Sequence, residues 1–122
     1  MSIKETITGN TFDELIGGPQ VTLITKNVTI AKSGIKKRGT VLGKNTTSGE
    51  FNTVSPAAAT DGTQIADCVL ARDVDATAAA VIATVYVSGV FNRNKLIVSE
   101  SDTVAKHEDE LRDKNIYLTK MI

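Results

Sequence analysis

The sequence contains very few of the residues that enzymes and metal proteins use most often. Its 122 residues include one cysteine, one histidine and no tryptophan. A single cysteine excludes an internal disulfide, and one histidine cannot complete a zinc site of the usual Cys/His kind. No combination of a nucleophile, a base and an orienting group is evident along the chain. The sequence therefore predicts a protein that is not an enzyme and that binds no cofactor or metal.

The sequence also has no excess of positive or negative charge, because 14 basic residues balance 14 acidic ones. Nucleic-acid-binding proteins usually carry a basic excess that neutralises phosphates, so no nucleic-acid partner is expected. The longest unbroken apolar run, Ala78–Ala83, is far shorter than a membrane span. The first ten residues lack the apolar stretch of a signal peptide. We expect no membrane partner and synthesis in the cytosol.

Aromatic residues are scarce, with three Phe and two Tyr, so the core must consist mainly of Val, Ile, Leu and Ala. A chain of this length forms one domain with a modest core. Because aromatic rings supply the largest buried areas, a small aliphatic core gains from further burial between subunits. A symmetric oligomer is therefore expected.

The clearest pattern that is present is a β-strand over Val81–Ser88, closed by Gly89. One alternating set of residues is Val81, Ala83, Val85 and Val87, and the other is Ile82, Thr84, Tyr86 and Ser88. This period of two with β-branched residues predicts a strand with one dry face. Further strands are expected at Val21–Ile24, Val28–Ala31, Thr40–Gly43, Ile65–Ala71 and Ile116–Ile122.

Turns and loops are expected between these strands. An acidic turn is predicted at Asp73–Asp75, with the turn before the long strand at Asp75–Ala78. Lys44–Gln64 has little periodicity and is predicted to be a long loop, which is usually functional or flexible. One helical turn is expected within Phe12–Pro19, stopped by its glycines and proline.

One convincing helix is predicted, at Thr103–Lys114, near the C-terminus. Ser101 or Asp102 can cap its start, and Asn115 can adopt the left-handed conformation that ends it. Its charges suggest two i,i+4 ion pairs, Glu108 with Arg112 and Glu110 with Lys114. It has few apolar residues and is expected to lie on the surface. The fold class predicted is mainly β (α+β), a small β-sandwich or barrel-like domain with one surface helix.

The N-terminal residues 1–11, MSIKETITGNT, are polar and weakly periodic, with isolated Ile3 and Ile7. They are expected to form a flexible arm. Residues 12–122 are then a single β-rich domain.

The residues that could carry chemistry have simpler structural interpretations. His107 lies in a charged helical segment without metal-binding partners and is predicted to be a solvated surface residue. Cys68 begins an apolar run and is predicted to be buried and inert. Asp73 and Asp75 are too few oxygen ligands for calcium and are predicted to accept hydrogen bonds from nearby backbone N–H groups.

Three further motifs are interpreted in the same way. Lys36-Lys37-Arg38 is predicted to solvate a hairpin turn. Gly39–Lys44 only partly matches a phosphate-binding loop, and Asn45 stands where that loop needs Ser or Thr, so a strand is preferred. Glu108, Asp109 and Glu110 are consecutive and do not form an acid–base pair.

Considered together, the chain resembles the lambda-type phage head decoration protein family. The matching residues are Phe12-Asp13-Glu14-Leu15-Ile16-Gly17-Gly18, Val28-Thr29-Ile30, Lys37-Arg38-Gly39-Thr40-Val41-Leu42-Gly43-Lys44, Val69-Leu70-Ala71, Asp73-Val74-Asp75-Ala76-Thr77, Val85-Tyr86-Val87-Ser88-Gly89, Phe91-Asn92, Leu96, Leu111-Arg112 and Ile116-Tyr117-Leu118. The resemblance covers about residues 12–122 and depends on the order and spacing of RGTVLGK, DVDAT and VYVSGxFN. Val90 stands where an acidic residue is expected, and Asn115 where Gly is usual.

The resemblance implies a small β-rich homotrimer on the outside of the expanded phage head. Its partner would be the major capsid protein at three-fold and quasi-three-fold positions, where it would stabilise the shell. Its location would be the virion surface, and the host cytoplasm before assembly. The N-terminal arm would become ordered on the capsid. The capsid-binding residues expected in the arm are Ile3, Thr6, Ile7, Thr8 and Phe12.

Two other functions remain to be compared with this one. A trimeric virion-surface module for attachment to a host cell or glycan would need exposed aromatic residues, and Phe51 is the candidate. A small hydrolase is disfavoured because its catalytic residues are missing.

Overall fold

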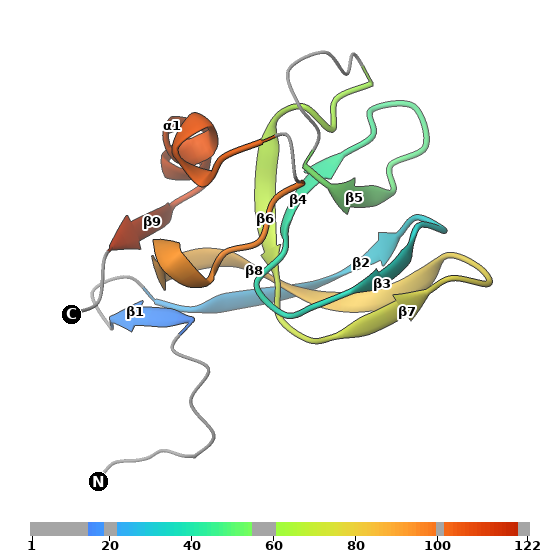
Figure 1. Ribbon diagram of the computed structural model, residues 1–122, viewed down its shortest axis with the longest axis horizontal. Helices are drawn as coiled ribbons and strands as arrows, with labels where there is room; N and C mark the ends of the chain where they lie inside the picture. The colour runs from blue at the N-terminus through green and yellow to red at the C-terminus, as the bar shows by residue number, and fades with distance from the viewer. Residues whose placement is uncertain (1–14, 19–21, 55–60, 100–101, 120–122) are drawn as a thin grey trace, which may run out of the picture.

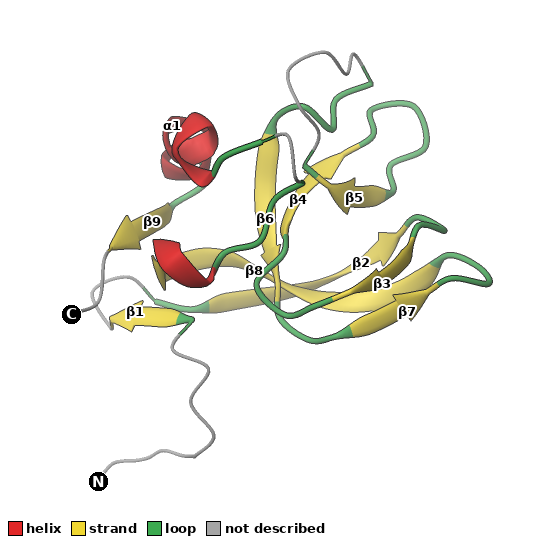
Figure 2. Cartoon of the chain, in the orientation of Figure 1, coloured by secondary structure: helices red, strands yellow, loops and turns green. Residues whose placement is uncertain are grey.

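The computed structural model describes residues 15–18, 22–54, 61–99 and 102–119. They form a mainly β structure, a five-stranded β-barrel with one short helix near the C-terminus, as predicted from the sequence (Figures 1 and 2). The strands are β1 (Ile16–Gly18), β2 (Ile24–Ile30), β3 (Gly34–Lys36), β4 (Val41–Lys44), β5 (Phe51–Thr53), β6 (Ala66–Leu70), β7 (Val74–Ala76), β8 (Val81–Asn92) and β9 (Ile116–Thr119). The helical segments are η1 (Arg93–Lys95), η2 (Val104–His107) and α1 (Glu108–Asp113).

The barrel closes because β8 pairs with a different strand along each edge. Its first half pairs antiparallel with all seven residues of β2, and its middle pairs antiparallel with β6. On the far side, β4 lies between β5 and β6, and one parallel pairing, Ile30 with Phe51, joins β2 to β5. The strand order around the barrel is therefore β8-β2-β5-β4-β6 and back to β8.

The alternation predicted in β8 is confirmed, since Ala83 and Val85 are buried while Ile82 is exposed. The predicted end of the strand is wrong. β8 continues through Gly89 to Asn92 and is 12 residues long. Gly89 permits this with a φ of 146°, and a Cβ atom there would lie 2.6 Å from a methyl carbon of Leu23.

Two apolar layers lie on opposite faces of the barrel wall. The barrel interior contains Ile30, Leu42, Phe51, Cys68, Leu70, Ala76, Ala83 and Val85. The outer layer contains Leu15, Val41, Val54, Ala66, Val69, Phe91, Leu96, Leu111 and Ile116. Alternation along β4 and β6 explains the division, because neighbouring residues of a strand point to opposite faces. An irregularity in the β4–β6 register, where Cys68 and Ala66 oppose consecutive β4 residues, turns Ala66 to the outer layer.

The outer layer is covered by the C-terminal elements, which we call the C-terminal cover (η2, α1 and β9, residues 104–119). β9 pairs parallel with the last four residues of β8, and β1 pairs antiparallel with the same stretch. Figure 1 shows β1 and β9 at one side of the molecule, with the β3–β7 ribbon at the other. The cover therefore lies beside the point where the described part of the N-terminal region joins the barrel.

Several boundaries differ from those predicted. The helical turn expected within Phe12–Pro19 is wrong for residues 16–18, which form β1 because they pair with β8. The two short strands expected on either side of Lys26-Asn27 are a single strand, β2, because every residue of it pairs with β8. The predicted turns at Asp73–Asp75 and Asp75–Ala78 overlap β7, which pairs with β3.

The remaining segments are partly as expected. The predicted loop Lys44–Gln64 contains a strand, β5, that completes the barrel. The predicted helix Thr103–Lys114 is a 3₁₀ turn followed by six α-helical residues. Asn115 ends it with a φ of 63°, which confirms the left-handed conformation expected there.

Candidate functional site

The predicted capsid-binding residues of the arm, Ile3, Thr6, Ile7, Thr8 and Phe12, lie outside the described residues. The structure does describe Leu15 and β1, with which the described part of the chain begins. Leu15 is 1% exposed within the outer layer, and its carbonyl oxygen accepts a hydrogen bond from the backbone N–H of Asn92 at 2.7 Å. Leu15 and β1 are therefore fixed to the end of β8.

This end of β8 is paired along both of its edges. Within four residues, β8 has β1 on one edge and β9 on the other. Val90, which stands where an acidic residue was expected, pairs with Gly18 of β1 and Tyr117 of β9 and is buried. An apolar side chain is consistent with that burial.

Large apolar side chains are exposed at several places on the described surface. The most exposed are Ile82 of β8, at 75%, and Ile35 of β3, at 65%. The others are Leu23, Ile24, Ile65, Ile97 and Tyr117. They belong to different strands and loops, and single exposed apolar residues are common on soluble proteins. By themselves they do not locate an interface.

Phe51, the aromatic residue on which the attachment alternative depended, is buried in the barrel interior. Among the aromatic residues that the structure describes, Tyr117 alone is exposed. The expectation of Phe51 as an exposed adhesive residue was wrong because β5 turns this side chain inward to close the barrel.

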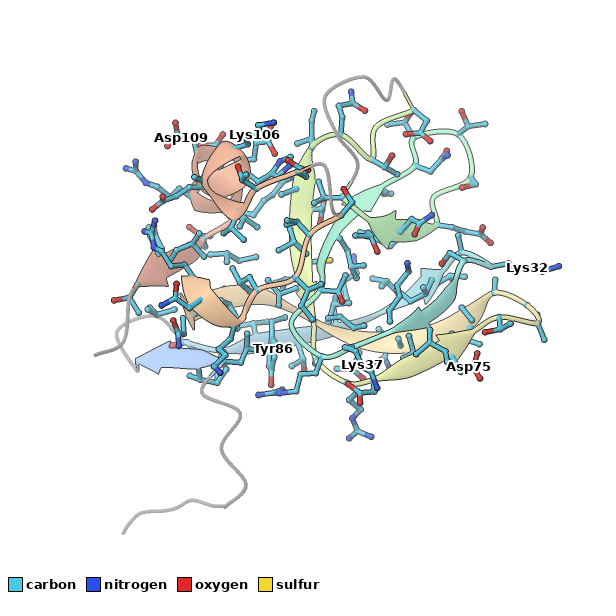
Figure 3. The ribbon with its side chains drawn as sticks, viewed as in Figure 1. Lys32, Lys37, Asp75, Tyr86, Lys106 and Asp109 are labelled. Atoms are coloured by element: carbon cyan, nitrogen blue, oxygen red, sulfur yellow. The ribbon has the colours of Figure 1, made fainter. Side chains whose placement is uncertain are left out.

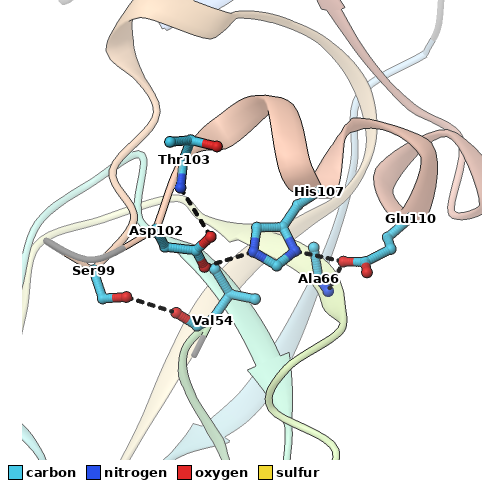
Figure 4. Close-up of polar contacts among 7 residues, drawn as sticks. All are labelled: Val54, Ala66, Ser99, Asp102, Thr103, His107 and Glu110. Carbon is cyan, nitrogen blue, oxygen red and sulfur yellow. Dashed lines mark hydrogen bonds and ion pairs between the residues drawn. The ribbon is translucent and has the colours of Figure 1, made fainter. Parts of the chain in front are cut away.

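The prediction of a solvated His107 is also wrong. Its side chain is 5% exposed and lies between two carboxylates, with Nε2 at 2.6 Å from Oδ2 of Asp102 and Nδ1 at 2.6 Å from Oε1 of Glu110 (Figure 4). Burial alone would lower the pKa of the imidazole. The hydrogen bonds to Glu110 and Asp102 and the charges of both carboxylates outweigh burial, and the pKa is raised above 6.5.

Both carboxylates of this cluster have further backbone donors. Oε1 of Glu110 accepts the N–H of Ala66 in β6 at 2.8 Å, and Oδ1 of Asp102 accepts the N–H of Thr103 at 2.8 Å. The spacing of His107 and Leu111, four residues apart on one buried helical face, was the available sequence signal. The charged residues around them obscured it.

The ion pairs of α1 differ from the two predicted pairs. Glu108 receives both guanidinium nitrogens of Arg93 in η1, at 3.1 and 2.9 Å, instead of pairing with Arg112. Lys114 lies 3.7 Å from Asp67 of β6 instead of pairing with Glu110. These charges connect the cover to η1 and to strand β6 of the barrel wall.

The basic run Lys36-Lys37-Arg38 is only partly solvated, contrary to the prediction. Lys36 is buried, its Nζ donates to Oγ1 of Thr53 at 2.9 Å, and burial lowers the pKa of the amine. Lys37 is exposed and lies 3.8 Å from Asp73. Figure 3 shows Lys32 reaching into solvent at the nearby β2–β3 turn.

Arg38 joins the end of this run to the outer face of β8. Its Nη1 donates to the hydroxyl of Tyr86 at 2.7 Å and to the carbonyl of Ala71 at 2.9 Å, and its backbone N–H donates to Oδ1 of Asp73. Asp75 likewise accepts the N–H of Thr77 at 3.0 Å. The prediction that these two aspartates accept nearby backbone N–H groups is confirmed for Asp75, whereas Asp73 accepts the N–H of Arg38, which lies 35 residues earlier in the chain.

The other motifs have structural roles. Cys68 is buried as predicted, and burial raises the pKa of its thiol. Val41–Lys44 is a strand, and a Cβ atom at Gly43 would lie 2.5 Å from the carbonyl oxygen of Thr63. Glycine is therefore needed there for close packing of a loop against β4.

Within the described residues, no group of three or more His, Cys, Asp or Glu side chains could hold a metal ion. No described helix is long and apolar enough to cross a membrane.

The comparisons with known proteins agree with the resemblance seen in the sequence. A search of curated proteins returned no match. The family model described as bacteriophage lambda head decoration protein D matches residues 5–116, which is most of the chain and includes part of the predicted arm. The chain therefore belongs to the bacteriophage lambda head decoration protein D family, a family of structural proteins of the phage capsid.

Proposed function

We propose that this protein assembles as a homotrimer on the outer surface of the expanded phage head and stabilises the shell there. It would contact the major capsid protein at three-fold and quasi-three-fold positions. The family match over residues 5–116 is the observation that carries this proposal. Before assembly the protein would be in the host cytoplasm, and afterwards on the virion.

Attachment would depend on residues 1–11 as an arm, with residues 12–122 as the domain that presents it. Leu15 and β1 are fixed to the end of β8, which gives the arm a defined point of departure from the barrel. An extended segment can add a strand to the edge of a neighbouring sheet through backbone hydrogen bonds. Ile3, Thr6, Ile7, Thr8 and Phe12 would provide the side-chain contacts.

Three arms on one trimer would overcome the weakness of a single arm. Ordering a free segment costs about 1–2 kcal/mol per residue, which offsets much of what each arm gains on binding. Linking the binding events raises the overall affinity roughly 10²–10⁴-fold. A trimer that contacts several capsid subunits at once would then resist their separation.

Light scattering of the purified protein tests the oligomeric part of the proposal. A mass about three times the 13.0 kDa of one chain is expected. A stable monomer over the concentration range of the binding experiments would contradict the trimer.

Cosedimentation with expanded, tail-free heads tests the arm. A chain lacking residues 1–11 is expected to remain trimeric and to lose head binding. Replacing Ile3 and Ile7 by Ser should weaken binding at least tenfold, since two apolar contacts per arm are removed. The matched control replaces Lys4 and Glu5 by Ser, which keeps net charge unchanged and should preserve binding. Undiminished binding of the truncated chain would exclude the arm from the mechanism.

A further inference from the structure

His107 occupies a buried site in which both of its ring nitrogens face a carboxylate oxygen at 2.6 Å. A neutral imidazole has one N–H and one lone pair, so it can donate to only one of two ionised carboxylates. Two such contacts require one additional proton. The imidazolium form supplies it directly and makes both contacts charge-assisted hydrogen bonds.

The cluster connects separate parts of the fold. Asp102 precedes η2, His107 ends η2, and Glu110 belongs to α1 and also accepts the N–H of Ala66 in β6 (Figure 4). The side chain of Asp102 is 1% exposed and that of Glu110 is 31% exposed. The imidazole is therefore the link through which the segment before η2 and the helix α1 are held together against the barrel.

Other carboxylates on α1 and β6 have partners of their own. On α1, Glu108 is paired with Arg93 of η1, and Asp109 with Arg112. On β6, Asp67 is paired with Lys114. Next to His107 on η2, Lys106 is exposed. Within the described residues, Asp102 and Glu110 are thus the carboxylates in contact with the imidazole.

We propose that Asp102, His107 and Glu110 form a pH-dependent latch, closed when His107 is an imidazolium, that holds the C-terminal cover on the barrel. When the imidazolium loses its proton to solvent, one of its two bonds to carboxylate is lost. The cover is then held by the apolar contacts of Leu111 and Ile116 and by the β8–β9 pairing.

The direction of the pH dependence follows from the raised pKa of His107. The folded state binds this proton more tightly than the unfolded state. The stabilisation is therefore complete below about 6.5, the ordinary pKa of histidine, and is lost as the pH rises through the higher pKa of the folded protein.

The chain has a single histidine, so nitrogen NMR of the folded protein reports this imidazole without assignment. At pH 6.5 both ring nitrogens are expected to carry protons, and the ring should titrate above 6.5. One unprotonated ring nitrogen at pH 6.5, or titration at or below that pH, would overturn the proposal.

Thermal unfolding of His107→Gln, measured from pH 5.5 to 9, distinguishes a latch from simple packing. Its unfolding midpoint should be roughly 5–15 °C below that of the unaltered protein at pH 5.5, and the difference should narrow as the pH rises. Lys106→Gln, which removes a neighbouring exposed charge, should leave the midpoint nearly unchanged. A difference that stays constant with pH would show that His107 acts only by filling space.

Discussion

The barrel interior and the C-terminal cover are held by different forces. The interior is almost entirely aliphatic, and eight buried residues of this layer include no ionisable group except the buried thiol of Cys68. The cover packs Leu111 and Ile116 on the wall, but it also depends on His107 between two carboxylates and on Arg93 paired with Glu108. Hydrophobic burial is insensitive to pH, whereas these ionic contacts depend on the protonation of their members.

This difference suggests that the barrel and the cover respond differently to a change in pH. The closed barrel would remain rigid over a wide range of conditions. The cover lies beside the point where β1 joins the barrel, so a change in the stability of the cover would affect the end of β8 with which β1 pairs. Local units of this kind can open with less free energy than global unfolding requires.

The largest effects are expected from leucine truncations, one in each region. Leu70 of the interior and Leu111 of the cover are both fully buried, and each change to Ala should cost about 2–5 kcal/mol. Hydrogen exchange should distinguish the two variants by the strands and helices in which backbone amides exchange faster. Leu70→Ala should accelerate exchange across β2, β4 and β8, and Leu111→Ala mainly in α1 and β9. Equal acceleration everywhere in both variants would mean that the two regions unfold as one unit.

The next effect concerns the charge within the cover. Asp102→Asn leaves the imidazolium with one ionised partner, and urea unfolding at pH 6 should show a loss of about 3 kcal/mol. Asp109→Asn is the control, because the Asp109 side chain is 94% exposed and its contact with Arg112 is 3.6 Å. That change should stay within about 0.5 kcal/mol. Similar losses in the two variants would contradict a special role for the cluster.

A smaller effect of opposite sign is expected from the buried amine near the barrel. Lys36→Met removes a desolvated amine that has a lowered pKa, and should raise the free energy of unfolding by up to about 1 kcal/mol at neutral pH. Because the folded state binds this proton less tightly, the unaltered protein gains stability as the pH rises toward 10.5, and the benefit of Met should shrink there. Lys32→Met, at an exposed position, should change little. A clear loss of stability in Lys36→Met would show that its bond to Thr53 outweighs desolvation.

The smallest effect is expected for Lys37→Ala. The Lys37–Asp73 contact is 3.8 Å long, and both side chains are more than half exposed. Its removal should change the unfolding free energy by less than about 0.5 kcal/mol, with little dependence on salt concentration. A larger loss, seen in urea titrations at low salt, would require a stronger ionic contribution at the β3–β7 ribbon than its geometry supports.

The strands with strong local signals were predictable from the sequence. β8 and β6 contain β-branched residues and are buried on at least one face, so the strands that their sequence patterns predict are present in the fold. β1 was not predictable, because Ile16-Gly17-Gly18 has the composition of a turn and becomes a strand only by pairing with β8. β2 was divided in the prediction because its first four residues are exposed and show no alternation, although each one pairs with β8.

The side-chain clusters were harder to predict than the strands. Phe51 and His107 lie in polar surroundings in the sequence. Phe51 is buried because β5 pairs with β2 and β4, and His107 contacts two carboxylates close in sequence, one of which also binds a distant strand. Glu110 reaches Ala66, 44 residues earlier, and Arg93 reaches Glu108 across 15 residues. The buried Cys68 was predictable because the apolar run beside it already indicated a core strand.

We propose above that this protein strengthens the phage head from outside. The most direct test of this proposal is the temperature at which expanded, DNA-filled heads release their DNA, measured by dye fluorescence with and without saturating protein. We expect a clear rise in that temperature with the full chain and none with the chain lacking residues 1–11. Release at the same temperature with and without the bound full chain would contradict it.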